Sequence, residues 1–168
     1  PPPRSSHPGP GPAPQEKVLK EQELSNALRA KDFRRAAALA FELKQPYRLL
    51  QVVQDIIALD DLGVLKTVVK PFTPEQLATC LSYLRDWNTT ARNSYPAQVL
   101  LHAIFCSFPQ SRLEKVADIK ALLAGLVPYT ERHLRRVEEA VQRTYLLDYT
   151  LQALRAAAAG DGYGGGLV

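Results

Sequence analysis

The chain has 168 residues, of which 46% are hydrophobic, and this is enough apolar material for one domain with its own core. The net charge of +4, from 21 basic and 17 acidic residues, is too small and too mixed to make the whole surface a phosphate-binding field, although a local basic patch stays open. No apolar run approaches the ~20 residues that span a bilayer, and no signal-peptide core is present, so we expect neither a membrane partner nor secretion.

Both ends of the chain are of low complexity. Residues 1–14 hold seven of the thirteen prolines, and proline removes backbone donors, so we expect a disordered Pro-rich linker there. Residues 156–168 are expected to be an Ala/Gly-rich flexible tail, with the alanines fraying from a helix. Residues 15–155 are then the folded, helical part. Because no methionine occurs, even at position 1, we interpret the chain as part of a longer protein.

Between these ends the apolar residues recur at helical spacing, and no convincing strand-like alternation occurs. A first helix is expected before a turn at Lys31 and Asp32, and a second follows it. The apolar face of this second helix obeys the i, i+3, i+4, i+7, i+8 rule and consists of Phe33, Ala36, Ala37, Ala40 and Phe41.

The next helix starts carry clear capping signals. Pro46 opens a third helix, and either Asp60 or Asp61 caps a fourth. Thr73 is followed by proline and, three residues after the cap, by Gln76, which is the spacing of a capping box. A fifth helix is therefore expected from this box to about residue 87.

Trp87, the only tryptophan, ends that helix, and we predict that it anchors the following connector on the core. Residues 88–94 are polar and are interpreted as this connector, with Ser94 capping the next helix. That helix is apolar on almost every side, so it is expected to be surrounded by others and to bury Cys106.

The last part of the folded region is expected to contain two further elements. Pro128 should stop a short apolar stretch over residues 119–127, and Thr130 should cap a final helix of six or seven turns. The fold class is therefore all-α: seven or eight antiparallel helices, packed as a small irregular α-solenoid or helical bundle without a fixed repeat.

The sequence offers no convincing catalytic or metal site. His102 and Cys106 stand four residues apart on one helix, but no Asp or Asn follows on that face to orient the imidazole. Cys80 and Cys106 lack the spacing of a zinc site, and the glycines gather in the tail instead of a phosphate-binding loop. We therefore expect no enzymatic activity, no cofactor, no metal and no small-molecule substrate.

The final helix carries the candidate partner-binding residues. Arg132, Arg136, Glu139 and Arg143 recur along one flank of a broad apolar face, and Arg135 lies to one side. Either Glu139 pairs with the neighbouring arginines on a solvated surface, or the arginines bind an acidic protein surface or RNA phosphates. The candidates are Arg132, Arg135, Arg136 and Arg143, together with Leu151 and Leu154 near the end of the apolar face.

Three segments carry a family resemblance. Residues 24–56, 84–105 and 126–154 resemble the C-terminal helical domain of transducin-beta-like 3 type WD-repeat proteins, also called the U-three snoRNA-associated protein thirteen family. The most specific parts are the Trp-Asn pair at residues 87–88 and the run over residues 126–133. In the family, β-propellers precede the helical domain, so residues 15–155 would be a C-terminal assembly domain.

The resemblance implies a non-enzymatic scaffold in the nucleus and nucleolus, within the small-subunit processome that matures pre-ribosomal RNA. The implied partner is the helical C-terminal domain of a sibling WD-repeat subunit, and contact with pre-rRNA or snoRNA in the full particle stays open. Two alternatives remain: a coat-type vesicle-trafficking solenoid, which residues 28–43 also resemble, and direct RNA binding through the arginines.

Overall fold

The computed structural model describes residues 14–160, and within them eight helices and no strand occur. All-α is therefore confirmed as the fold class. The expected Pro-rich linker lies outside the described residues except for Pro14, as do residues 161–168 of the expected tail. The helices are α1 Pro14–Arg29, α2 Phe33–Glu42, α3 Pro46–Ala58, α4 Leu62–Val69, α5 Pro74–Asn88, α6 Ala91–Ser107, α7 Gln110–Leu113 and α8 Ile119–Gly160.

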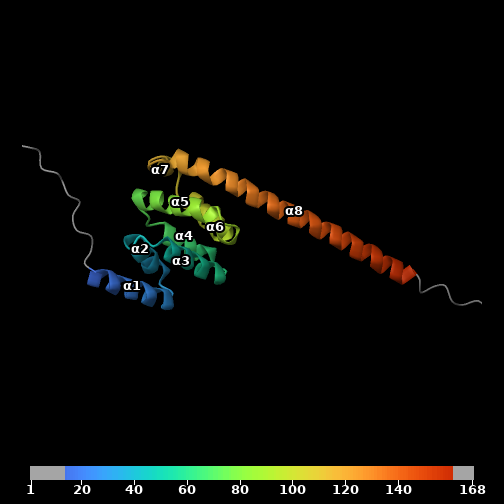
Figure 1. The fold of residues 1–168 in the computed structure, drawn as a ribbon, viewed down its shortest axis with the longest axis horizontal. Coiled ribbons are helices and arrows are strands. Elements are labelled where there is room, and N and C mark those ends of the chain that lie inside the picture. The colour runs from blue at the N-terminus through green and yellow to red at the C-terminus, as the bar shows by residue number, and fades with distance from the viewer. Residues whose placement is uncertain (1–13, 161–168) are drawn as a thin grey trace, which may run out of the picture.

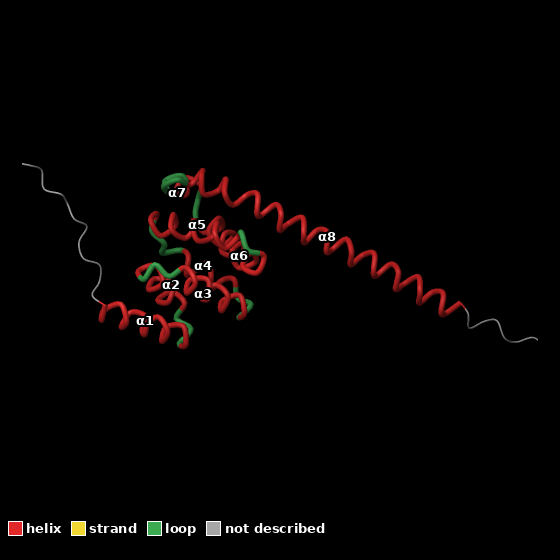
Figure 2. Tube along the Cα trace, viewed as in Figure 1, coloured by secondary structure: helices red, strands yellow, loops and turns green. Residues whose placement is uncertain are grey.

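Helices α1 to α6 form a compact body in which the helices are joined by short loops (Figures 1 and 2). Successive helices pack on one another except at α4, which packs on α3 and on α6. The core of this body is mainly aliphatic with a few aromatic rings, and α2 and α3 each bury one apolar face in it. Phe41 packs edge-on against Phe72, with ring centroids 5.0 Å apart. None of the helices in the described part of the chain is both long and apolar enough to cross a membrane.

Local capping chemistry sets the start of several helices. Both hydrogen bonds of the capping box join Thr73 and Gln76, as the sequence predicts. Asp61 is the residue that caps α4, since its carboxylate accepts the backbone N–H of Gly63. Asp60 instead adopts a left-handed φ of 54° in the turn that ends α3.

The expected connector over residues 88–94 is wrong. Helix α5 runs to Asn88, and α6 begins at Ala91 with Thr90 as its N-cap. Ser94 therefore lies inside α6, where its hydroxyl donates to the carbonyl of Ala91. A short bend replaces the connector, and α6, with Pro96 buried on its inner face, packs directly on α5.

Helix α8 also corrects the sequence prediction. It is one helix of 42 residues that includes Pro128 and continues through residues 156–160, so Pro128 does not stop a helix and Thr130 does not cap one. An internal proline costs ~3 kcal/mol in a helix. Burial on both sides of it offsets this cost, because Leu126 is 3% exposed and Thr130 and His133 are half-buried.

Helix α6 is less enclosed than its composition predicts. Its inner face is buried, but Phe105 is 45% exposed and Cys106 is exposed, so the expectation of a buried Cys106 is wrong. The reason is that α8 covers only part of α6 before it leaves the body, and one side of α6 stays open (Figure 1). Cys80, by contrast, is fully buried in α5.

Candidate functional site

The chemistry of the two cysteines gives no support for catalysis. The sulfur of Cys106 lies 3.5 Å from Nδ1 of His102, and both residues are exposed. Burial raises the pKa of Cys80 to about 12, so this thiol stays protonated at neutral pH and is a poor nucleophile. Within the described residues no group of three or more His, Cys, Asp or Glu side chains could hold a metal ion.

The feature that stands out is the C-terminal part of α8, residues 134–158, which we call the projecting segment. Figure 1 shows this segment extending away from the body. Every side chain in it is exposed. Nine of these are large and apolar, with exposed fractions between 46% and 71%: Leu134, Val137, Val141, Tyr145, Leu146, Leu147, Tyr149, Leu151 and Leu154. So many exposed apolar side chains on one element are typical of an interaction surface.

The apolar face of the projecting segment continues the face that packs on the body. Leu126, which is buried, is followed at steps of three and four residues by Thr130, His133 and Val137. Such steps keep side chains on one side of a helix. The same face is therefore covered by α5 and α6 at its start and bare beyond them.

The four candidate arginines are all exposed, and the structure draws no ion pair to any of them. The interpretation in which Glu139 pairs with Arg136 and Arg143 is therefore not seen among the described residues. The guanidinium of Arg132 lies 5.4 Å from the centre of the Tyr129 ring, a cation–π contact. Leu151 and Leu154 are 49% and 66% exposed, so both are available to a partner.

A polar cluster fixes the direction of α8 on the body. The amide nitrogen of Asn88 donates to the carbonyl of Leu126 at 3.2 Å and to the hydroxyl of Thr130 at 3.0 Å. Nε2 of Gln98 donates to the side-chain Oδ1 of Asn88 at 3.1 Å and to the Thr130 hydroxyl at 2.8 Å. Nε2 of His133 lies 2.8 Å from the backbone carbonyl of Asn88 and must carry the proton, because a carbonyl only accepts.

The sequence alone does not reveal this cluster. In the sequence, Asn88 stands out only as part of the Trp-Asn pair in the family resemblance. Its partners lie ten to 45 residues away, and no spacing pattern connects positions that distant. The signal that the sequence does carry is a polar threonine and a histidine, Thr130 and His133, on the apolar face of the last helix. Trp87 beside it is 7% exposed and stacks on Tyr83, but its anchoring role stays a prediction.

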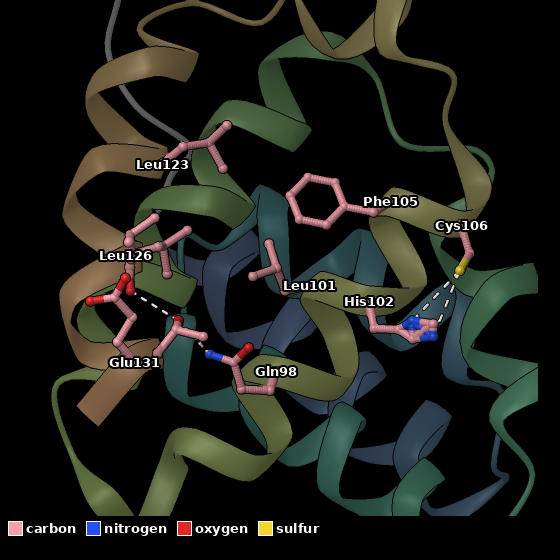
Figure 3. A pocket seen from close by; sticks show the side chains of 10 residues that line it. Gln98, Leu101, His102, Phe105, Cys106, Leu123, Leu126 and Glu131 are labelled. Atoms are coloured by element: carbon pink, nitrogen blue, oxygen red, sulfur yellow. Dashed lines mark hydrogen bonds between the residues drawn. The ribbon is translucent and has the colours of Figure 1, made fainter. Parts of the chain in front are cut away.

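A hollow lies in the angle between α6 and α8. Figure 3 shows side chains of the two helices on opposite walls of this hollow, which measures about 670 Å³ and has Leu101, Phe105 and Leu126 among its lining residues. A second hollow of about 300 Å³ shares Gln98 and Thr130 with the first and reaches Leu134 and Val137. The two hollows therefore adjoin each other and extend from the body to the start of the projecting segment.

Comparison with known proteins gives the family. Residues 21–154 match the model of the Utp13 specific WD40 associated domain. Transducin beta-like protein 3 from Bos taurus is 32% identical over 145 residues, covering 86% of this chain and 18% of the relative. The human protein of that name is 31% identical over 136 residues, covering 80% of this chain and 17% of the relative.

U3 small nucleolar RNA-associated protein 13 from Saccharomyces cerevisiae is 28% identical over 148 residues, which cover 80% of this chain and 18% of the relative. The chain thus spans less than a fifth of the length of these curated relatives. The family match covers α2 to α7 in full, residues 21–29 of α1 and α8 up to residue 154, which takes in most of the projecting segment. The chain therefore belongs to the family of the Utp13 specific WD40 associated domain.

Proposed function

We propose that the chain is the helical assembly domain of a nucleolar WD-repeat subunit of the small-subunit processome. In this role it is a non-enzymatic scaffold in pre-rRNA processing and small ribosomal subunit biogenesis. Membership of a WD40-associated family supports the propeller context, and a relative named for its association with U3 small nucleolar RNA supports the particle. The observation that carries the scaffold role is the bare apolar face of the projecting segment.

The proposed partner is the helical C-terminal domain of a sibling WD-repeat subunit. A partner that covers Leu147, Leu151 and Leu154 removes apolar side chains from water, and this supplies the main free energy of association. Arg136 and Arg143 flank this face without an ion pair in the described residues, and carboxylates of the partner would satisfy them. Charges at the rim of an interface mainly raise the association rate.

Co-expression with the sibling helical domain tests this proposal. Leu151→Asp places a charge on the apolar face and should abolish the complex, whereas Gln142→Asp, an exposed position one helical turn or more away on another side, should leave it intact. Circular dichroism checks that both variants stay helical. A complex that survives Leu151→Asp unchanged would contradict the use of this face.

A full-length WD-repeat protein that carries this helical domain should localise to the nucleolus. Its purification from cells should bring down small nucleolar RNA and nucleolar proteins. Recovery of vesicle-coat subunits in their place would reject the processome and favour a trafficking solenoid.

Direct RNA binding is the second candidate, because four arginines of α8 have no carboxylate partner in the described residues. Helix α8 offers few stacking platforms for bases beside them, since Tyr129 is already in contact with Arg132 and the exposed rings further along are Tyr145 and Tyr149. We therefore expect weak binding by the isolated chain. Sub-micromolar binding that falls steeply with salt and is lost in the Arg132/Arg136/Arg143 triple alanine variant would favour RNA.

A further inference from the structure

The projecting segment carries uncharged residues, mostly aliphatic, at a seven-residue repeat. Starting at Val137, alternating steps of three and four residues reach seven positions on one side of the helix, which we call the heptad seam: Val137, Ala140, Thr144, Leu147, Leu151, Leu154 and Ala158. All seven side chains are exposed, and none is charged. A sustained seven-residue repeat on a helix is the pattern that packs against another helix in a left-handed coiled coil.

The residue types along the heptad seam favour two strands. The step of three residues identifies Val137, Thr144 and Leu151 as a positions, and Leu147 and Leu154 as d positions. Two of these three a residues are β-branched, and two of the three d positions before the end are leucine. Within parallel coiled coils, β-branched residues at a with leucine at d favour two strands over three or four. The seam spans 22 residues, or about 33 Å at 1.5 Å per residue.

The two edges of the heptad seam differ in charge. Arg136 and Arg143 hold the g positions on one edge, while the e positions on the other edge include both Asp148 and Arg155 and carry no net charge. In a parallel pair, each g residue meets an e residue of the partner helix. The g arginines therefore require carboxylates at the partner's e positions. Arg135 holds an f position, on the side of the helix away from the seam.

The seam runs into the hollows of the body. Val137 is both the first seam residue and part of the lining of the hollow of about 300 Å³, together with Tyr95 of α6. A helix lying along the seam therefore meets α6 as well as α8 where it reaches the body. Because the heptad seam adjoins the hollow, one end of the partner helix would contact the body at α6, and this contact would set the position of the partner along the seam.

We propose that the projecting segment is one strand of a parallel two-stranded coiled coil, and that its partner is an amphipathic helix with aliphatic a and d residues and carboxylates facing Arg136 and Arg143. The inference rests on the proposed function, because it describes how the scaffold partner is held. It assigns different roles to neighbouring residues: Leu147 lies at the interface, whereas Tyr149 and Arg135 face away from it.

A synthetic peptide tests this chemistry without the natural partner. The probe has four heptads with valine at a, leucine at d and glutamate at e and g, and the matched control has lysine at e and g. We expect the 168-residue chain to bind the glutamate peptide and not the lysine peptide in fluorescence anisotropy, because the first complements the g arginines. Equal binding of both peptides, or of neither, would overturn the proposal.

Two matched pairs of variants test the register. Leu147→Asp should weaken binding of the glutamate peptide by roughly 30-fold, as for a hot spot, while Tyr149→Asp two residues away should not change it. Arg143→Glu should weaken binding and Arg135→Glu should not. Because each pair introduces the same residue into the same exposed helix, a general loss of helix affects both members alike. The opposite ranking would place the interface on another side of α8.

Cross-linking tests the direction of the partner. In a Cys106→Ser background, Val137→Cys should form a disulfide with a glutamate peptide that carries cysteine at its first a position. A disulfide with cysteine at the last a position instead would contradict the parallel arrangement.

The same variants separate this inference from the proposed function. Suppose that the sibling domain does not bind, but the glutamate peptide binds and the variants rank as expected. The proposed partner is then wrong, while the proposed coiled coil is supported. Suppose instead that Leu146→Asp and Tyr149→Asp abolish the complex with the sibling domain, but Leu147→Asp does not. The scaffold role is then supported, and the heptad seam is not the interface.

Discussion

Asn88 shows how one buried polar residue can orient a whole helix. It is completely buried, and its side-chain and backbone groups engage residues of α6 and α8. A buried polar group that lost these partners would cost about 1–3 kcal/mol. No buried side-chain nitrogen or oxygen in the described residues lacks a hydrogen bond, so the cluster is fully satisfied.

We predict that Asn88→Ala lowers the free energy of unfolding by about 1–3 kcal/mol, because Thr130 and the Leu126 carbonyl each lose a donor. Chemical denaturation measures this change. Asn26→Ala, at an exposed position, is the control and should change stability by less than about 0.5 kcal/mol. Equal stability of the two variants would show that the cluster contributes nothing to holding α8.

Trp87 is predicted to be a structural residue. Its ring is 7% exposed and lies 6.3 Å from the ring of Tyr83, between centroids, at an interplanar angle of 30°. Trp87→Ala should lower stability by about 3–5 kcal/mol, the range for a large aromatic removed from a core. Tyr47→Ala, at a ring that is 75% exposed, should have little effect. A Trp87→Ala chain that kept its melting temperature but lost a partner would assign the residue to an interface.

The two cysteines should differ sharply in reactivity. At pH 8 a thiol reagent should modify one residue, Cys106, in the folded chain and both cysteines only after denaturation. Folding raises the pKa of Cys80 from 9.0 to about 12, so its contribution to stability is present below pH 9 and is lost as the pH rises towards 12. The Cys80→Ala variant should lack this component in pH-dependent unfolding. Modification of both thiols in the folded chain would contradict the burial of Cys80.

At the scale of elements, helix starts follow local chemistry while the run of α8 does not. The capping box fixes the beginning of α5 through contacts three residues apart. Pro128 gives an equally local signal for a helix end, yet α8 continues through it. The packing of residues on both sides of this proline against α5 and α6 outweighs the lost backbone hydrogen bond.

Because Pro128 is exposed and already helical, Pro128→Ala should stabilise the protein. The gain in the free energy of unfolding should be at most the ~3 kcal/mol difference in helix propensity between proline and alanine. It is smaller to the extent that the backbone around Pro128 has already relaxed to accommodate the ring. Thermal unfolding followed by circular dichroism measures it. A lower melting temperature for Pro128→Ala would indicate that the proline sets a bend that the fold needs.

The whole molecule divides into a body that buries its own core and a projecting segment that buries almost nothing. Helices α1 to α6 hold most of the buried side chains, while every described side chain from residue 134 onward is exposed. An isolated exposed helix is held mainly by its own hydrogen bonds and is marginal in water. A partner would thus stabilise this segment as well as bind it.

Removal of residues 137–168 should therefore leave the body intact. We expect the shortened chain to unfold at nearly the same temperature as the full chain, because the core and the polar cluster end at His133 and before. The helical signal at 222 nm should fall, and binding of the glutamate peptide should disappear. A large loss of thermal stability would mean that the projecting segment packs on the body in solution.

The sequence by itself determined the helical class, most helix starts and the apolar side of each body helix, because these depend on residues three or four positions apart. It also placed the exposed Leu151 and Leu154 and the arginines on α8. Tertiary structure decided the rest. Pro128 remains helical and α6 begins at Ala91 because helices distant in sequence pack around these positions. Cys106 is exposed because no other helix in the described part of the chain covers it. The partnership of Asn88 with Thr130 and His133 spans more than 40 residues, and only the packed fold brings such groups within hydrogen-bonding distance.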